Sequence, residues 1–366
     1  MKIFYKISQL MLCMGLASTN TFAQDDATVH QVDATQPTGT LLDVIPETID
    51  RLPTVLPEQS DQRIVPQTQQ TKDNSWVDQK QYKFTNKLQQ YAHKIDNWFG
   101  ETDPNDPASA NLRIMMDTRW NRYDDFSVKP RIRGRIKLPT LENRFSVVFG
   151  DDSLDNEIRG NVGIDNENPQ GNPDKTLDRR QTRDDNASIA LRWSRLSKSL
   201  GIDTDADLGV RSGDDVYLRL KAQKDWELNN HFSTHAEQIY RYGLDSKHYL
   251  RTNLELRHAR PNEAFLSDQL SFTYTDDSDE SNFIWENRIF RQHQFFHNNW
   301  FNYGIYTTGN LDDGGSKFNS YGPFVSWRQP VWREWFFVQS ELNYYNNKDL
   351  DRSHYLSALL RLEAWF

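Results

Sequence analysis

Four basic residues at two-residue spacing are the most unusual chemical feature of the sequence. Arg131, Arg133, Arg135 and Lys137 alternate with Ile132, Gly134, Ile136 and Leu138. Alternate residues of a β-strand point to opposite faces, so all four cations are expected on one face. Like charges on one strand face repel each other unless water, carboxylates or an anionic ligand screens them. The pattern therefore indicates a surface that attracts anions, or one that neighbouring acidic residues brace.

The same alternation assigns more charged residues to this face. Together with the four above, the predicted set comprises Arg113, Asp117, Arg219, Lys221, Arg251 and Glu255. Basic residues dominate the face although the whole chain has a formal net charge of −9. One interpretation is the lining of a pore that contacts a solute, because charged side chains set selectivity in channels. The other is structural, with Arg–Asp and Arg–Glu networks that brace the interior.

No motif predicts catalysis or metal binding. Histidines such as His235, His248 and His258 have no Ser or Asp in a recognisable catalytic arrangement. The acidic stretch from Asp151 to Asp185 offers oxygens for Ca²⁺ but lacks the spacing of a calcium loop, so we expect a solvated loop. We predict no enzyme activity, no catalytic residues, no metal and no cofactor.

Composition excludes several classes of protein. Mean hydropathy is −0.83, and beyond the first two dozen residues no stretch approaches the ~18 apolar residues of a membrane helix. A membrane β-barrel stays possible, because its lipid-facing residues alternate with polar ones. Aromatic residues make up 13% of the chain, and such rings populate membrane–water interfaces. The acidic balance argues against a nucleic-acid partner.

The amino-terminal region divides into four predicted segments. Residues 1–23 have the charged, apolar and small-residue order of a signal peptide, with Cys13, the only cysteine, inside the apolar run. Residues 24–74, rich in Asp, Gln, Thr and Pro, indicate a disordered periplasmic segment, or a tether that binds a partner or enters a barrel. Residues 75–100 predict an amphipathic helix, and residues 101–110 a linker.

The apolar stripe of this helix must be covered. It comprises Phe84, Leu88, Tyr91, Ile95 and Trp98. We expect it to pack on the wall or in the lumen of a barrel. The alternative is a helix that lies on the periplasmic membrane surface or on the rim of the barrel.

Residues 111–366 show segments of about 8 to 11 residues with alternating polarity, separated by turn-like clusters. Fourteen strands are predicted, at 112–120, 131–138, 144–150, 186–193, 205–211, 216–226, 232–242, 249–258, 266–275, 282–292, 300–308, 319–328, 335–344 and 354–366. Two of them are irregular, because Gln238, Glu286 and Arg288 share a face with apolar residues. A bulge or a miscounted hairpin there would reduce the number to twelve.

The last strand ends on an aromatic residue. Leu356, Ala358, Leu360, Leu362, Ala364 and Phe366 share one apolar face, and the sequence ends at Phe366. With the leader and the strand pattern, this resembles the Gram-negative outer-membrane β-barrel proteins, without pointing to a subfamily. The resemblance implies an antiparallel up-and-down barrel in the outer membrane, with the amino-terminal region in the periplasm. It also implies that Leu360, Leu362, Ala364 and Phe366 are read by the barrel-assembly machinery.

The resemblance also carries expectations about function. Barrels of about fourteen strands are mostly channels or solute transporters, which implies passage of a small solute. An arginine-rich lumen favours a polar or anionic solute. The alternative is a non-transporting barrel with a structural, envelope-assembly or partner-anchoring role. Outer-membrane lipid and lipopolysaccharide are the other expected partners.

Overall fold

The computed structural model describes residues 76–100, 107–141, 144–156, 179–197, 200–212, 214–260, 264–276, 281–295, 299–312 and 315–366. All of them belong to one compact unit, Glu47–Phe366. The predicted signal peptide at 1–23, the predicted disordered segment at 24–74 and residues 101–106 of the predicted linker lie outside the described residues.

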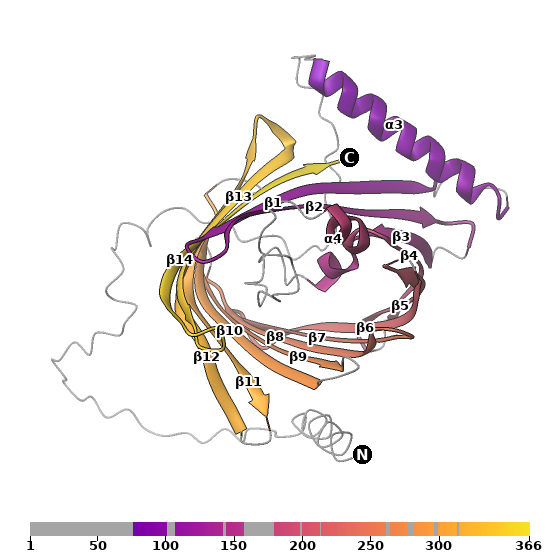
Figure 1. Ribbon diagram of the computed structural model, residues 1–366. Helices are drawn as coiled ribbons and strands as arrows, with labels where there is room; N and C mark the ends of the chain where they lie inside the picture. Colours follow the sequence, from indigo (N-terminus) through magenta and orange to yellow (C-terminus); the bar gives the residue numbers. More distant parts are fainter. Residues whose placement is uncertain are drawn as a thin grey trace, which may run out of the picture. The chain divides into compact units, whose positions relative to one another are not determined.

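Fourteen antiparallel strands form a closed barrel in this part of the chain (Figure 1). Each strand pairs with its neighbours in sequence, and β14 pairs with β1, so that the sheet closes on itself. The strands are β1 Ser109–Asn121, β2 Asp125–Leu138, β3 Phe145–Gly150, β4 Ser188–Ser197, β5 Ile202–Arg211, β6 Asp215–Glu227, β7 Phe232–Gly243, β8 Lys247–His258, β9 Phe265–Asp276, β10 Ser281–His293, β11 Trp300–Asp312, β12 Gly315–Val331, β13 Arg333–Asn347 and β14 Arg352–Trp365. The prediction of fourteen strands is confirmed, and the alternative of twelve is wrong.

The two faces of the sheet are inverted relative to those of a water-soluble barrel. Large aliphatic side chains are exposed on the outer face, including Leu208 at 61% and Ile189 at 57%. Charged side chains of the inner face are buried, and Arg361 has no exposed surface. Such a distribution suits a wall with lipid outside and polar groups inside.

The two irregular strands need no change of register. In β7, Gln238 points outward and its amide is satisfied, because Thr252 donates to Gln238 Oε1 at 2.8 Å and Gln238 Nε2 donates to the Arg251 carbonyl at 2.9 Å. In β10, Glu286 and Arg288 lie on the inner face together with Phe290. There Phe290 packs with three other inward aromatic residues, Phe265, Tyr306 and Phe324. The mixed pattern is therefore an aromatic patch inside the lumen.

Three helical segments accompany the strands: α3 (Trp76–Asp96), the 3₁₀ helix η2 (Asp152–Asn156) and α4 (Arg179–Asp185). In the part of the chain that the structure describes, no helix is both long and apolar enough to cross a membrane. The helix predicted at 75–100 ends at Asp96, and residues 97–100 form turns. It lies against the outer face of β1 and β2, where Ala92 and Leu88 contact Ala110 and Ile136 (Figure 1).

The predicted apolar stripe of α3 is only partly correct. Tyr91 and Trp98 are 59% and 79% exposed, so they are not covered by the barrel. Ala92 and Asp96 are the residues of α3 that become buried. The barrel therefore covers a small and partly polar face of α3, because short side chains let the helix approach the wall closely.

Strand β3 is short, and the long β3–β4 connection follows it. Since β3 ends at Gly150, no described strand pairs with the first half of β2 on that side. The side chain of Asn186 takes that place: Ile132 N–H donates to Asn186 Oδ1 at 2.7 Å, and Asn186 Nδ2 donates to the Pro130 carbonyl at 2.9 Å. This connection lies at the end of the barrel opposite the rim where β1 begins and β14 ends, which we call the terminal rim.

Candidate anion site in the barrel lumen

The chain enters the lumen at Gly150, which has a φ of +93°. A Cβ built at this position would lie 2.0 Å from the Ile132 carbonyl oxygen, so only glycine fits. The next residue, Asp151, donates its N–H to the same carbonyl at 2.7 Å. This turn directs η2 away from the wall and toward the arginine side chains of the inner face.

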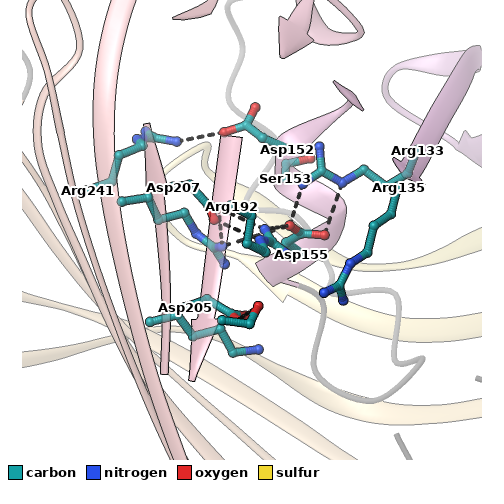
Figure 2. Close-up of polar contacts among 12 residues, drawn as sticks. Arg133, Arg135, Asp152, Ser153, Asp155, Arg192, Asp205, Asp207 and Arg241 are labelled. Atoms are coloured by element: carbon teal, nitrogen blue, oxygen red, sulfur yellow. Dashed lines mark hydrogen bonds and ion pairs between the residues drawn. The ribbon is translucent and has the colours of Figure 1, made fainter. Parts of the chain in front are cut away.

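Asp155 of η2 is the centre of the candidate site. Its carboxylate accepts hydrogen bonds from Arg133 and from Arg192, the latter at 2.5 Å (Figure 2). Arg219 Nη1 lies 3.8 Å from the same carboxylate. The three guanidinium groups come from β2, β4 and β6. A single carboxylate thus occupies the point on which three cations converge, as a bound anionic ligand would.

The electrostatic state of Asp155 follows from these neighbours. Burial by itself raises the pKa of a carboxyl group, but the charges of Arg133, Arg192 and Arg219 and the hydrogen bond from Arg133 outweigh it. The pKa of Asp155 therefore lies well below its ordinary value. Asp155 is therefore an anion at neutral pH.

Two other loop carboxylates extend the network. Asp151 accepts a hydrogen bond from Arg131 Nε at 2.6 Å. Asp152 accepts one from Arg241 Nη1 at 3.1 Å (Figure 2). We predicted a solvated loop from Asp151 to Asp185, and for Asp151, Asp152 and Asp155 that prediction is wrong. Their carboxylates leave water because buried guanidinium groups replace it.

Carboxylates of the barrel wall also bind arginines of the inner face. Asp207 accepts from Arg192 at 2.7 and 2.8 Å and from Arg219 at 3.1 Å. Asp117 accepts from Arg361 at 2.6 and 2.7 Å. These bidentate and shared arginine–carboxylate contacts fix the orientation of the guanidinium groups of Arg192, Arg219 and Arg361.

A cavity of about 70 Å³ lies beside Asp155. At ~15 Å³ for each water on this measure, it has room for about five waters or for one small anionic group. Its cationic lining consists of Arg113, Arg133, Arg135 and Arg192. Arg133 Nη1 is buried and donates to no atom of the described residues. The cavity therefore has a mainly cationic lining beside one carboxylate.

The structure brings together part of the predicted site. Arg113, Arg133 and Arg135 line the cavity. Arg219 reaches Asp155 from the neighbouring wall, and Arg131 joins Asp117 to the loop. Lys137 lies farther along β2, in register with Ser146.

The other predicted residues lie elsewhere on the inner face. Lys221 pairs with Glu237 at 2.5 Å. Arg251 Nε donates to Asn253 at 3.0 Å, and Glu255 accepts from Arg257 at 2.9 Å. The Lys221 contact joins β6 to β7, and the other two contacts lie within β8. None of the three residues lines the cavity.

Sequence reasoning missed the residue at the centre. Arg192 and Asp207 could be placed on the inner face by strand alternation, but Asp155 belongs to a segment without periodicity. The only local signal is Gly150, which follows an apolar strand and precedes two aspartates. In the described residues, no group of three or more His, Cys, Asp or Glu side chains is arranged to hold a metal ion.

The fold defines the class of the protein as a closed, antiparallel, fourteen-stranded β-barrel of the outer-membrane type, which confirms the predicted resemblance without adding a subfamily. No known family model matches the sequence, and no curated protein matches it either.

Solved structures of outer-membrane proteins show a distant likeness. The outer-membrane protein OmpT of Vibrio cholerae has 9% identity over 73% of this chain and 99% of its own, with a TM-score of 0.41. OprB of Pseudomonas putida at high pH has 8% identity over 71% and 94%, with a TM-score of 0.43. The outer-membrane channel DcaP of Acinetobacter baumannii has 9% identity over 73% and 99%, with a TM-score of 0.39.

Proposed function

We propose that the protein is an outer-membrane channel that passes small polar or anionic solutes through its charged lumen. The observation that carries this proposal is the convergence of Arg133, Arg192 and Arg219 on one carboxylate, beside a cavity with a cationic lining. Guanidinium groups in this arrangement recognise carboxylate and phosphate oxygens by paired hydrogen bonds.

The outer surface supports the placement in a membrane. Exposed aliphatic residues cover the outside of the strands, and Trp226 and Trp327 are exposed near the terminal rim. Tyr242 and Tyr344 are exposed near the opposite end. Aromatic residues at two levels, with aliphatic residues between them, match the two interfaces and the hydrocarbon core of a bilayer. We place the terminal rim in the periplasm, since short turns and chain ends lie on that side of such barrels.

In this proposal Asp155 acts as an internal substitute for the anionic group of a solute. Because η2 is tethered to the wall, its carboxylate has a high effective concentration at the arginines. A solute anion enters the adjacent cavity, which Arg113 and Arg135 line, and exchanges with Asp155 for the shared guanidinium groups. This exchange lets a multiply charged arginine cluster bind an anion without holding it permanently.

Conductance in planar bilayers tests the proposal. Purified residues 24–366 are expected to form pores whose reversal potential in a salt gradient shows anion preference. Asp155→Asn removes one negative charge at the convergence point, so it should shift the reversal potential further toward the anion value. Asp245→Asn makes the same charge change on an exposed turn and serves as the control. If neither residues 24–366 nor residues 110–366 carry current, the channel proposal is refuted.

One observation favours the second candidate, a non-transporting barrel with a structural, envelope-assembly or partner-anchoring role. The loop carboxylates Asp151, Asp152 and Asp155 neutralise arginines on the inner wall, which gives the lumen a bracing network. The same bilayer measurement separates the two functions. If the network only braces the lumen, we expect no current from wild type, Asp155→Asn or Asp245→Asn. We also expect lower thermal stability for Asp155→Asn.

A further inference from the structure

Helix α3 follows the terminal rim of the barrel across four neighbouring strands. Asp78 accepts a hydrogen bond from Arg333 at the start of β13, at 2.6 Å. Phe84 makes an edge contact with Phe366, which follows β14, with ring centroids 4.9 Å apart. Farther along the helix, Gln89 bonds to Ala110 near the start of β1, and Asp96 Oδ1 accepts from Thr140 N–H just after β2, at 3.2 Å.

These contacts define the direction of the helix. Contact points along α3 occur in the order of the strands around the barrel, β13, β14, β1 and β2. A helix of 21 residues is about 31 Å long, and here that length extends along the rim and not along the strands. Because the barrel axis runs through the bilayer, α3 lies in the plane of the membrane.

Gln89 explains why the helix is held at this position. Strand β14 stops pairing where Phe366 exchanges two hydrogen bonds with Leu112. The backbone groups of Ala110 would therefore lack a partner on that side. Gln89 Nε2 donates to the Ala110 carbonyl at 2.8 Å, and Ala110 N–H donates to Gln89 Oε1 at 3.0 Å. The amide thus takes the place of a strand partner for Ala110.

The faces of α3 that the barrel does not cover differ in chemistry. At 100° per residue, Val77, Phe84 and Ile95 share one flank, which is apolar. Gln79, Asn86, Gln90 and His93 share the opposite flank, which is polar. Between these flanks, facing away from the barrel, lies an exposed stripe of Trp76, Lys80, Lys83, Lys87, Tyr91 and Lys94.

The lysines of this stripe have no carboxylate partner in the described residues, and Lys94 Nζ lies 5.9 Å from the centroid of the Tyr91 ring. Lys80, Lys83, Lys87 and Lys94 are all exposed, and no ion pair joins them to another described side chain. Four cations with a spacing of three, four and seven residues repel each other along one helix face, which weakens an isolated helix. An anionic surface outside the protein removes this repulsion.

We propose that α3 is an interfacial helix that binds anionic phospholipid headgroups in the leaflet at the terminal rim. The apolar flank points into the acyl region, continuous with the lipid-facing residues of β14 and β1. Its polar flank points to water, and the lysines lie at the level of the phosphates, between Trp76 and Tyr91. This assignment needs only a barrel that spans a membrane, so it is independent of whether the barrel conducts.

Lipid binding tests the charge of the stripe. Residues 24–366 in detergent are titrated with phosphatidylglycerol or phosphatidylcholine, and bound lipid is counted by native mass spectrometry. A lysine near an anionic headgroup contributes about fivefold in affinity at low salt. Lys80, Lys83 and Lys87 changed together to Gln should lower the affinity for phosphatidylglycerol by more than tenfold and leave phosphatidylcholine binding unchanged.

A matched variant shows which rim binds the lipid. Lys247, Lys317 and Lys348 changed together to Gln remove the same charge at the opposite end of the barrel. Phosphatidylglycerol affinity should be retained in this protein. Equal losses in the two triple variants, or no loss in either, would overturn the proposal.

Depth measurements test the orientation of α3. Since Cys13 is the only cysteine and precedes residue 24, each introduced cysteine is unique in this protein. Val77→Cys and Gln79→Cys carry a nitroxide on opposite flanks, two residues apart. In vesicles that contain phosphatidylglycerol, the label at 77 should collide more with oxygen and less with a water-soluble nickel complex than the label at 79. Equal accessibility at both positions would contradict the interfacial orientation, whatever the lipid titration shows.

Discussion

At the scale of single residues, the lumen depends on carboxylates that are held ionised by arginine. Asp155 has a side chain only 11% exposed and contacts three guanidinium groups. Removing one member of such a cluster leaves the others buried without a counter-charge, which costs more than the intact pair contributes. Asp117 is in the same situation between Arg131 and Arg361.

The first prediction concerns Asp155 and pH. A carboxyl group whose folded pKa is depressed stabilises the fold above its unfolded pKa, and this contribution is lost as the pH falls through the folded pKa. Since the pKa of Asp155 lies well below 3.8, denaturant unfolding in detergent should show its full contribution from pH 7 down to about pH 5. Asp155→Ala should cost on the order of 3 kcal/mol at pH 7.

This stability difference between wild type and Asp155→Ala should narrow only under strongly acidic conditions. A difference that already disappears between pH 7 and pH 5 would show that the carboxylate is not held by the arginines. Asp245→Ala, on an exposed turn, should change the unfolding free energy by less than about 0.5 kcal/mol.

At the scale of elements, the position of η2 depends on how β3 ends. Its last residue must turn the chain inward while the Ile132 carbonyl accepts from Asp151. Strand alternation carries no information about this turn, and neither does charge. The site is therefore positioned by a backbone conformation that one glycine makes possible.

The second prediction tests that glycine. Gly150→Ala places a Cβ against the Ile132 carbonyl oxygen and forces a φ near +93° on a residue with a side chain. Such backbone strain costs about 1–3 kcal/mol, and the clash adds to it, so the unfolding midpoint should fall. Gly315→Ala is the control, because its φ is +110° but nothing lies within 4 Å of a Cβ there. If both variants lose equal stability, backbone strain alone is responsible and the close approach to Ile132 is not.

At the scale of the whole molecule, closure joins the two ends of the described barrel. Pairing of β14 with β1 is completed by Phe366, whose N–H and carbonyl both bond to Leu112. Phe366 also contacts Phe84 of α3. The carboxy-terminal residue therefore connects the first strand, the last strand and the helix.

The third prediction separates assembly from stability at this position. Deleting Phe366 removes two backbone hydrogen bonds, worth about 1 kcal/mol each, and one aromatic contact. We expect less protein in the outer-membrane fraction of expressing cells, measured by immunoblot after heated and unheated gel electrophoresis. Phe366→Ala keeps the backbone bonds, so purified protein should refold in detergent nearly as well as wild type. A normal membrane level for both variants would argue against recognition of the terminal residue.

The fold was predictable because one physical rule applies along the entire wall. Every second side chain from β1 to β14 has the same surroundings, so two-residue periodicity locates each strand. Where the rule weakens, as at Gln238 and Phe290, the reason is a local hydrogen bond or an aromatic contact inside the lumen. Asp155 could not be found in this way, because its partners lie 22 and 37 residues away for Arg133 and Arg192. Such a site is created only when the strands stand side by side.

The contacts of η2 also determine which strands must be in place before this segment can dock. Asp151, Asp152 and Asp155 bind arginines that come from strands between β2 and β7, up to 89 residues later in the chain. In whatever order the strands join, these contacts can form only when β2 to β7 stand side by side. A docked η2 therefore signals that half of the wall has reached its final register.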